Sequence, residues 1–374
     1  MSRYVVAVIC CLIVIALESV SMSAQGKKNA KSAKASSGVP SAGQSSNPSQ
    51  TKTASALPEV KQTPLLDSAQ LLIQPTFTSL DEALRRADKV YKLRLDENNL
   101  TALPGTIGRL VNLQELSLNF NQLSTLPPEI GKLTNLQVLV LDKNKIKRLP
   151  TELKSLVNLQ KLYLNHYNQM EDSEVPPDYE PGVELRALWL AVDSLTKLET
   201  LGLGGNRLKE IPRGLLKISS LRHLYINDNA LAELSEDIYK LQNLEQLDIS
   251  NNQLKGLPAE IGKMKTLQML DLRLNSLLKL PSELGNCSAM TELDVGFNML
   301  KELPEEIGNL TKLERINISN NRLSTVPASI ERWEKLKKLK MVDNPIKDDA
   351  DVAMKLRKLQ VRRPAPSIER DIKR

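Results

Sequence analysis

The chain has 374 residues, with 51 Lys and Arg against 44 Asp and Glu, a net charge of +7 and only 3% aromatic residues. This length allows two ordinary domains or one long repeat array, and the scarcity of aromatic residues requires an aliphatic core. The excess positive charge lies towards the two ends of the chain, where it is typical of solvated termini, so we expect no nucleic-acid partner.

The N-terminus has the features of a secretory signal peptide over residues 1–24. Arg3 precedes an unbroken apolar run from Tyr4 to Leu17, and small residues follow it up to Ala24. A basic start, a short apolar stretch and a small-residue exit characterise export signals. The sequence therefore predicts a secreted, periplasmic or cell-surface protein. An uncleaved anchor is the alternative, and it is the only membrane contact that we expect, although the run is shorter than the roughly 20 residues that span a bilayer.

Two segments precede the main part of the chain. Residues 25–62 are rich in Ser, Ala, Lys and Pro and hold few large apolar residues, so they cannot offset their ordering entropy and are predicted to form a disordered linker. Residues 63–89 are predicted to form a helical cap. The stretch Ser79 to Glu82 has the Ser-x-x-Glu form of a capping box, which should open a helix that reaches Ala87 and covers the first repeat.

A 23-residue repeat dominates residues 90–348. Its aliphatic positions recur in about ten units and a partial unit, as in Leu93 and Leu95 and, 23 residues later, Leu116 and Leu118. The alternation of apolar and polar residues at these positions predicts a short strand with one buried face. Stacked units would bury a continuous core. The expected fold is an α/β solenoid with a parallel, concave sheet and short helical or 3-10 turns on the convex side.

An asparagine recurs shortly after each predicted strand. A buried amide must be hydrogen-bonded, and each of these amides could bond the backbone of the neighbouring unit. We therefore predict a structural asparagine ladder. Its members are Asn98, Asn121, Asn144, Asn206, Asn229, Asn252, Asn275, Asn298, Asn321 and Asn344.

An aromatic group and an insertion coincide in the middle of the array. The unit that begins at Leu159 is 16 residues longer than the others, and the extra chain, near residues 168–185, is acidic and proline-rich. Insertions in repeats often serve binding, although a neutral surface loop is the alternative. Aromatic residues are strong binding anchors, and the predicted set, facing solvent around a trough formed by Gly202, Gly204 and Gly205, is Tyr163, His166, Tyr167, His223 and Tyr225. The two histidines lie too far apart to share a metal ion, so we predict no metal and no cofactor.

Asp248, Asp271 and Asp294 occupy the same position in three successive predicted strands. Adjacent strands lie about 4.8 Å apart, so these like charges should repel and favour a basic partner or a cation. The alternative is that aspartate is simply common at this exposed position.

The C-terminal part, residues 349–374, is expected to contain a capping helix and a basic, mobile tail. Val352, Leu356 and Leu359 have the helical spacing that would seal the last repeat; a helix that binds a partner or a membrane surface is the alternative. Cys287 stands where other units have leucine, so it is interpreted as a buried apolar residue and not as a nucleophile.

The repeated pattern resembles the leucine-rich-repeat family, specifically the 23-residue subclass found in Ras suppressor and plant intracellular Ras-group-related repeat proteins. Departures are Tyr167 where asparagine is expected, Ser235 where proline is expected, and the insertion. The resemblance implies a right-handed horseshoe that binds macromolecules.

The sequence predicts a non-enzymatic recognition module that is exported and captures a protein ligand on its concave face. The alternative, implied by the resemblance, is an intracellular scaffold in small-GTPase-type signalling. An enzyme would require a set of catalytic residues, and we find none in the sequence.

Overall fold

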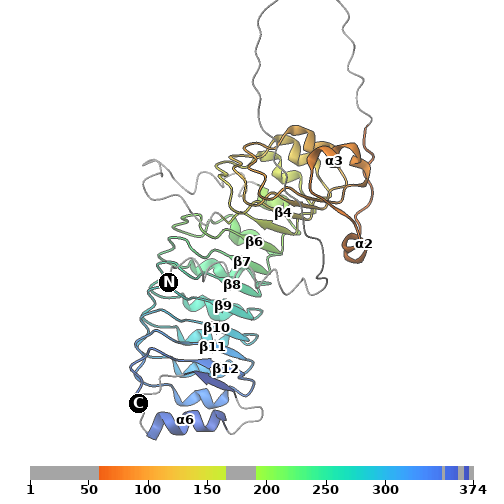
Figure 1. Ribbon diagram of the computed structural model, residues 1–374. Coiled ribbons are helices and arrows are strands. Elements are labelled where there is room, and N and C mark those ends of the chain that lie inside the picture. Colours follow the sequence, from red (N-terminus) through yellow and green to blue (C-terminus); the bar gives the residue numbers. More distant parts are fainter. Residues whose placement is uncertain (1–58, 166–190, 348–349, 361–365, 370–374) are drawn as a thin grey trace, which may run out of the picture. The chain divides into compact units, whose positions relative to one another are not determined.

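The computed structural model describes residues 59–165, 191–347, 350–360 and 366–369 (Figure 1). The predicted signal peptide, most of the predicted linker and the insertion near residues 168–185 lie outside the described residues. Within the described ranges, none of the helices combines the length and the apolar character that crossing a membrane requires.

The described residues form one open sheet of thirteen parallel strands, which follow one another across the sheet in chain order (Figure 1). Equivalent residues are paired, as in Leu93 with Leu116, 23 residues apart. This confirms the predicted solenoid with a parallel sheet. The strands are β1 (Thr76–Phe77), β2 (Lys92–Arg94), β3 (Glu115–Ser117), β4 (Val138–Val140), β5 (Lys161–Tyr163), β6 (Thr200–Gly202), β7 (His223–Tyr225), β8 (Gln246–Asp248), β9 (Met269–Asp271), β10 (Glu292–Asp294), β11 (Arg315–Asn317), β12 (Lys338–Lys340) and β13 (Ser367–Glu369).

Short 3-10 helices return the chain from each strand to the next, as the spacing predicts. Most of them follow a proline such as Pro127 or Pro281, whose φ near −70° suits the residue before a helical turn. The 3-10 helices are η1 (Ala87–Lys89), η2 (Gly105–Arg109), η3 (Pro128–Lys132), η4 (Thr151–Ser155), η6 (Val192–Ser194), η7 (Leu215–Lys217), η8 (Glu236–Lys240), η9 (Ala259–Lys263), η10 (Ser282–Asn286), η11 (Glu305–Asn309) and η12 (Ala328–Arg332).

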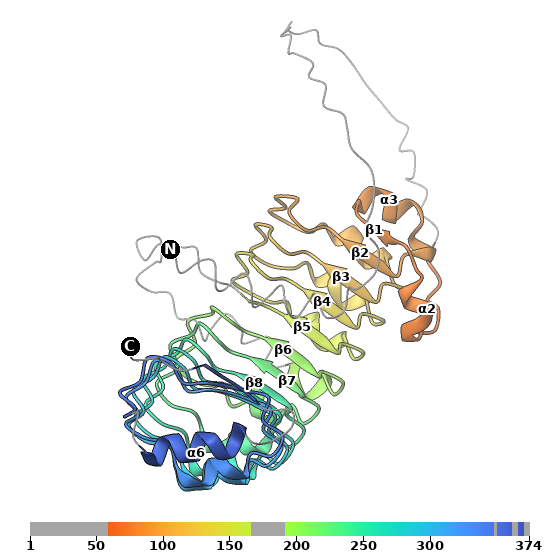
Figure 2. The same ribbon diagram turned by 60° about the horizontal axis from the view of Figure 1, so that its bottom comes forward.

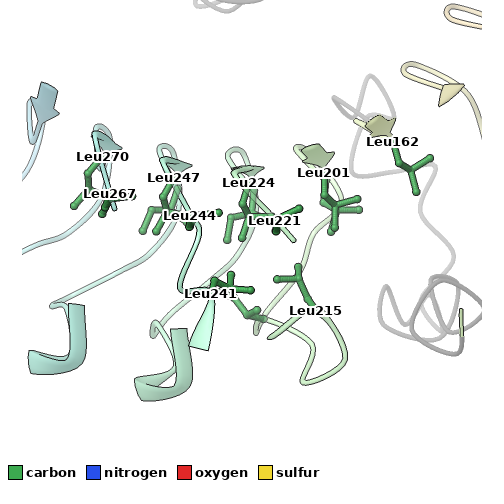
Figure 3. Close-up of a cluster of buried hydrophobic side chains, with 14 of the residues drawn as sticks. Leu162, Leu201, Leu215, Leu221, Leu224, Leu241, Leu244, Leu247, Leu267 and Leu270 are labelled. Atoms are coloured by element: carbon green, nitrogen blue, oxygen red, sulfur yellow. The ribbon is translucent and has the colours of Figure 1, made fainter. Parts of the chain in front are cut away.

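The core fills the space between the sheet and the 3-10 helices. Leu221 and Leu224 descend from one strand segment, Leu244 and Leu247 from the next, and Leu241 approaches them from the opposite side (Figure 3). All five are buried. Each such side chain contributes roughly 1.5–3 kcal/mol on burial. Since one unit has no partner for its own apolar face, this gain exists only when units stack.

The repeated asparagines lie at the edge of this core and are bonded to the backbone on both sides. Asn252 is representative: its side-chain oxygen accepts from the Leu231 N–H at 3.0 Å, and its amide nitrogen lies 3.1 Å from the Ile226 and Ile249 carbonyl oxygens. The same bonds recur at Asn275, which accepts from Leu254. Each of these buried amides therefore links two successive units. Asn98, the first member of the predicted ladder, is an exception: it is exposed, and among the described residues its side chain bonds only the Asp96 carbonyl of its own unit.

The residue before each of these asparagines has a left-handed backbone, with φ between 51° and 71°. This conformation costs most side chains roughly 1–2 kcal/mol, whereas glycine, asparagine and aspartate adopt it readily. Asn251 and Asn320 suit the position. Bulky apolar residues do not, and three of them stand there: Phe120, Leu274 and Phe297.

Two short helices and a two-residue strand cover the N-terminal end of the sheet (Figure 2). Helix α3 (Leu80–Arg85) begins at Ser79, whose hydroxyl accepts from the Glu82 N–H, and α3 packs against β1 and η2. Helix α2 (Ser68–Leu72) begins at Asp67, which forms a reciprocal capping box with Gln70. Helix α2 lies within residues 63–89, which were predicted as a helical cap, whereas strand β1 was not expected.

The chain upstream of α2 is fastened to the side of the first repeats by two asparagines. The Thr63 N–H donates to Asn112 Oδ1 at 2.6 Å, and Asn135 Nδ2 donates to the Thr63 carbonyl at 2.9 Å. Gln62, inside the segment predicted as a linker, donates to Asn135 Oδ1.

The C-terminal end is covered by helix α6 (Ala350–Gln360), which packs against η12 and lies beyond β12 in Figure 1. Val352, Leu356 and Leu359 are its buried residues. Strand β13, which pairs with β12, lies where the sequence analysis expected a mobile tail. Its three residues continue the parallel sheet beyond the last recognisable repeat.

Candidate ligand-binding surface

The face of the sheet opposite the core carries every second strand residue. In β3, Leu116 points into the core, whereas Glu115 and Ser117 lie on the other face and are half-buried. Because side chains alternate along a strand and equivalent residues are in register, residues of successive strands form columns on this face. We call it the exposed face; it is the surface on which the sequence predicts ligand binding.

Three of the predicted aromatic residues lie on the exposed face on either side of β6. Tyr163 ends β5, whereas His223 begins and Tyr225 ends β7. Gly202 of β6 is the register partner of both tyrosines. We call Tyr163, His223 and Tyr225 the aromatic cluster.

The strand between these aromatic residues is closed to solvent. Thr200 is only 3% exposed, although equivalent residues of the other described strands are half-buried or exposed. A Cβ atom on Gly202 would lie 3.0 Å from Tyr163 Cδ1 and 2.8 Å from Asn165 Nδ2. Neighbouring side chains therefore fill the space above the glycine. The predicted open trough is wrong: the cluster is a packed surface.

The aromatic cluster is held by polar contacts within the sheet. Thr200 Oγ1 and His223 Nδ1 are 3.1 Å apart, and Tyr225 Oη donates to Gln246 Oε1 at 3.0 Å. Burial lowers the pKa of His223, which the charge of Glu245 partly opposes, so its neutral form is favoured. Both tyrosines are half-buried, which corrects the expectation that they simply face solvent.

His166 and Tyr167, the other two residues of the predicted aromatic set, lie outside the described residues. So does the insertion that follows them. The described cluster therefore consists of residues from β5 and β7 alone.

The three aspartates of the acidic column also lie on the exposed face, at the ends of β8, β9 and β10. Each carboxylate accepts the backbone N–H two residues further on: Ser250 for Asp248, Arg273 for Asp271 and Gly296 for Asp294, at 2.9–3.0 Å. At the end of β11, the side-chain oxygen of Asn317 likewise accepts the Ser319 N–H. The column thus has a local structural role, which the sequence analysis did not foresee.

A basic residue already lies among these carboxylates. Arg273 Nε is 2.9 Å from Asp271 Oδ2, and its guanidinium also approaches Asp294 at 3.6 Å. The expected repulsion within the column is therefore partly offset from inside the molecule. This weakens the expectation that the aspartates await a cation or a basic partner.

Two aspartates of the column have shifted acidities. Burial, followed by the charge of Asp271, raises the pKa of Asp248 to about 6. The same two causes, in the same order, raise the pKa of Asp294 to about 6. Both groups bind protons more readily in the folded protein than in the unfolded chain, whose aspartates titrate near 3.9.

Acidification from pH 7.5 to pH 5 is therefore expected to stabilise the fold through these groups, because the folded state binds more protons than the unfolded state in that window. His223 opposes this effect. Its pKa is lowered in the folded protein, so the unfolded chain takes up this proton more readily as the pH falls, and acidification destabilises the fold through this group. The test compares wild type with the Asp248→Asn, Asp294→Asn double variant by thermal denaturation. The variant should lose on the order of 2 kcal/mol of the acid-induced gain.

Asparagine is the matched replacement, since Asn317 accepts the same backbone bond naturally. At pH 7.5 the variant should be at least as stable as wild type, because buried like charges have been removed. An identical pH dependence in the two proteins would show that the aspartates titrate normally.

A second side-chain ladder crosses the first half of the exposed face. Asp96 accepts from the Asn119 N–H, Asn119 from Asp142, Asp142 from Asn165, and Asn165 from Gly204, at 2.7–3.0 Å. Burial raises the pKa of Asp142, although its bonds to Asn165 oppose this. This ladder was not predicted, although an Asp/Asn alternation at 23-residue spacing is visible in the sequence.

The two kinds of backbone capping divide the exposed face. The ladder between units ends at Gly204, which has no side chain to offer an acceptor to the next strand. Capping within one unit begins at Asp248. The aromatic cluster, with Tyr163 and Tyr225 flanking β6, lies between these two regions of the exposed face.

The described side chains that could serve as a nucleophile or as metal ligands are either buried in the core or not grouped closely enough to hold a metal ion. Cys287 is fully buried, its thiol donates to the Ile261 carbonyl at 3.2 Å, and burial raises the pKa of the thiol to about 11. It is therefore protonated near neutral pH and inaccessible to a substrate. Among the described residues, no group of three His, Cys, Asp or Glu side chains is placed to hold a metal ion.

Known solved structures share the fold. An internalin, InlF, from Listeria monocytogenes is 22% identical, with a TM-score of 0.55, over 77% of this chain and 84% of that one. The functional domain of InlJ from Listeria monocytogenes is also 22% identical, with a TM-score of 0.54, over 70% of this chain and 51% of that one.

The ectodomain of the plant membrane receptor kinase GASSHO1/SCHENGEN3 from Arabidopsis thaliana is 22% identical, with a TM-score of 0.50, over 79% of this chain but 39% of that one. No curated protein matches the chain in sequence.

Family models match most of the repeat array. The model described as "Leucine-rich repeat region" matches residues 81–176 and 206–298, just over half of the chain, and the model "Leucine rich repeat" matches residues 288–346. The matched ranges hold strands β2–β5 and β7–β12, most of the 3-10 helices and the bonded asparagines described above. The chain therefore belongs to the leucine-rich-repeat family.

Proposed function

We propose that the chain is an exported, non-enzymatic recognition module that binds a protein ligand on the exposed face, centred on the aromatic cluster. The observation that carries the proposal is the grouping of Tyr163, His223 and Tyr225 around β6 in a protein with only 3% aromatic residues. Solenoids bind through extended surfaces of this kind.

The packing of the aromatic cluster supports this proposal. Bonds to Thr200 and Gln246 preorganise the side chains of His223 and Tyr225, so a ligand would lose little side-chain entropy on binding these two residues. Large, rigid aromatic residues are the usual centres of protein interfaces. The plant receptor ectodomain was solved in complex with Casparian strip integrity factor 2, an example of ligand binding within the same fold.

The test uses the full chain as bait, identifies the captured protein by mass spectrometry and measures its Kd. Changing Tyr163 and Tyr225 to alanine should weaken binding at least fivefold, equivalent to about 1 kcal/mol. The control is Arg94→Ala, which lies on the exposed face of β2, away from the cluster. Circular dichroism must show that both variants remain folded.

An unchanged Kd in the tyrosine variant would place the ligand elsewhere. A second variant pair, Tyr225→Phe and Tyr163→Phe, separates ring contact from hydroxyl contact. The phenylalanine variants should retain binding if the rings are the anchors.

The proposed export distinguishes this function from an intracellular scaffold in small-GTPase-type signalling, the function implied by the resemblance to the 23-residue Ras-suppressor-like subclass. Mass spectrometry of the natural protein should find a mature N-terminus near residue 24. Residues 1–24 still attached to protein in a cytosolic fraction would favour the scaffold, and residues 1–24 retained in a membrane fraction would indicate an anchor.

A further inference from the structure

Four apolar side chains lie outside the core on two adjacent turns, those that leave β9 and β10. Leu274, Leu278 and Phe297 are 49%, 53% and 51% exposed, and Met299 is half-buried. Backbone bonds fix their proximity. The Leu274 N–H donates to the Gly296 carbonyl, beside Phe297, and the Met299 N–H donates to the Leu277 carbonyl, beside Leu278. We call these four residues the edge patch.

The backbone of the edge patch makes its composition unusual. Leu274 and Phe297 have φ of 55° and 57°, in a conformation that bulky residues rarely adopt. The equivalent residues of the flanking units are Asn251 and Asn320, which suit it. The sequence therefore accepts both backbone strain and exposure of apolar surface at two adjacent positions. Asparagine would avoid this strain, so the choice of bulky apolar residues at these two positions suggests a function.

Phe120 provides a comparison at the same repeat position. It also has a left-handed backbone and is 50% exposed, but Lys143 Nζ lies 4.5 Å from the centre of its ring. An interaction within the fold thus compensates for exposure of Phe120. Among the described residues, no cation lies over the ring of Phe297.

Basic side chains border the edge patch. The Leu278 N–H donates to the Lys255 carbonyl, Lys301 follows the patch residue Met299 by two positions, and the Arg322 N–H donates to the Leu300 carbonyl. All three cations are exposed, and within the described part of the chain they form no ion pairs. The carboxylate closest in sequence to these three cations is that of Glu302, which follows Lys301.

We propose that the edge patch is a second docking site and that it binds an acidic segment of a protein partner through apolar side chains. Apolar anchors would cover Leu274, Leu278, Phe297 and Met299, while carboxylates would pair with Lys255, Lys301 and Arg322. The site is separate from the aromatic cluster on β5 and β7, so either site can fail without the other.

An anionic membrane has the same general chemistry but fits the surroundings less well. The exposed-face carboxylates Asp271 and Asp294 lie only three residues before Leu274 and Phe297 along the chain. A broad anionic surface would approach these carboxylates together with the patch. A narrow peptide can follow the turns and avoid them.

The test begins with stability, using the Leu274→Asn, Phe297→Asn double variant of the full chain. Asparagine suits a left-handed backbone, so the melting temperature should be unchanged or higher than that of wild type. A clear decrease would show that the patch serves the fold, which would overturn the proposal. The matched control is Phe120→Asn, the same change at the same repeat position outside the patch.

Binding is then measured with a displayed library of random 12-residue peptides, selected on wild type and counter-selected on the double variant. The proposal requires enriched peptides that combine Asp or Glu with large apolar residues. These peptides should bind the double variant at least tenfold more weakly and the Phe120→Asn control as tightly as wild type. Enrichment that lacks acidic residues, or no enrichment that depends on the patch, would overturn it.

The second arm uses vesicles of phosphatidylcholine with 30% phosphatidylserine. One outcome is that the wild-type chain sediments with these vesicles, the double variant does not, and the library yields no selected peptide. This combination would identify the patch as membrane-binding and reject the protein partner. No sedimentation, together with patch-dependent peptides, supports the proposal.

Discussion

Replacing Asn252 by alanine is expected to lower the free energy of unfolding by roughly 2–4 kcal/mol, because it leaves buried backbone groups without partners. The Asn252 side chain accepts from the Leu231 N–H and donates to the Ile226, Ile249 and Ser250 carbonyls. Water has little access to these groups, since the asparagine is 8% exposed. Urea unfolding followed by circular dichroism measures the effect.

The matched control is Asn98→Ala, at the exposed beginning of the same column. Asn98 bonds the Asp96 carbonyl, a contact within its own unit. Its loss should lower stability by no more than about 1 kcal/mol. Similar losses at the two positions would show that burial and the bonds between units do not determine the role of the asparagines.

The period of the sequence carried most of the information about the fold. Each unit repeats the same aliphatic positions, and the strand leucines, such as Leu93 and Leu116, are paired in the sheet. A solenoid depends mainly on contacts between adjacent units, so a local pattern specifies its architecture. Outside the repeats, local signals still indicated α3, through the Ser79 cap, and α6, through its helical spacing. Strands β1 and β13 have no such local signal, because each is defined by its pairing with a neighbouring strand, and both were missed.

The candidate site was less predictable than the fold. The column positions of Tyr163 and Tyr225 follow from the repeat, but whether Gly202 lies in an open trough or under neighbouring side chains depends on rotamers. Sequence spacing contains no information about the side-chain direction of Asn165, which occupies part of that space. The same holds for Arg273, whose guanidinium turns back towards the aspartates.

The edge patch shows a different limit. Leu274 and Phe297 are apolar and therefore look like additional core residues when only composition is considered. Their exposure follows from the left-handed turn before each ladder asparagine. Recognising such a patch requires knowledge of which repeat position leaves the core.

Gly285→Ala is expected to destabilise the protein by roughly 1–3 kcal/mol through overpacking between adjacent 3-10 helices. Gly285 belongs to η10, and a Cβ atom there would approach the Glu306 carbonyl oxygen of η11 to within 2.1 Å. A backbone atom cannot move aside as a flexible side chain can. The two 3-10 helices must separate, which would loosen the packing around their buried residues Leu284 and Ile307.

Gly256→Ala is the matched control, because a Cβ atom at Gly256 would have no other heavy atom within 4 Å. Alanine also restricts the unfolded chain more than glycine does, so this change should be neutral or stabilising by up to about 1 kcal/mol. Thermal denaturation of both variants distinguishes steric packing from a general effect of glycine replacement. If Gly285→Ala proves as stable as Gly256→Ala, the close approach of η10 and η11 does not determine the spacing of the units. If it unfolds at lower temperature, the glycines of the turns limit how tightly successive units stack, just as the asparagines hold them together on the other edge of the core.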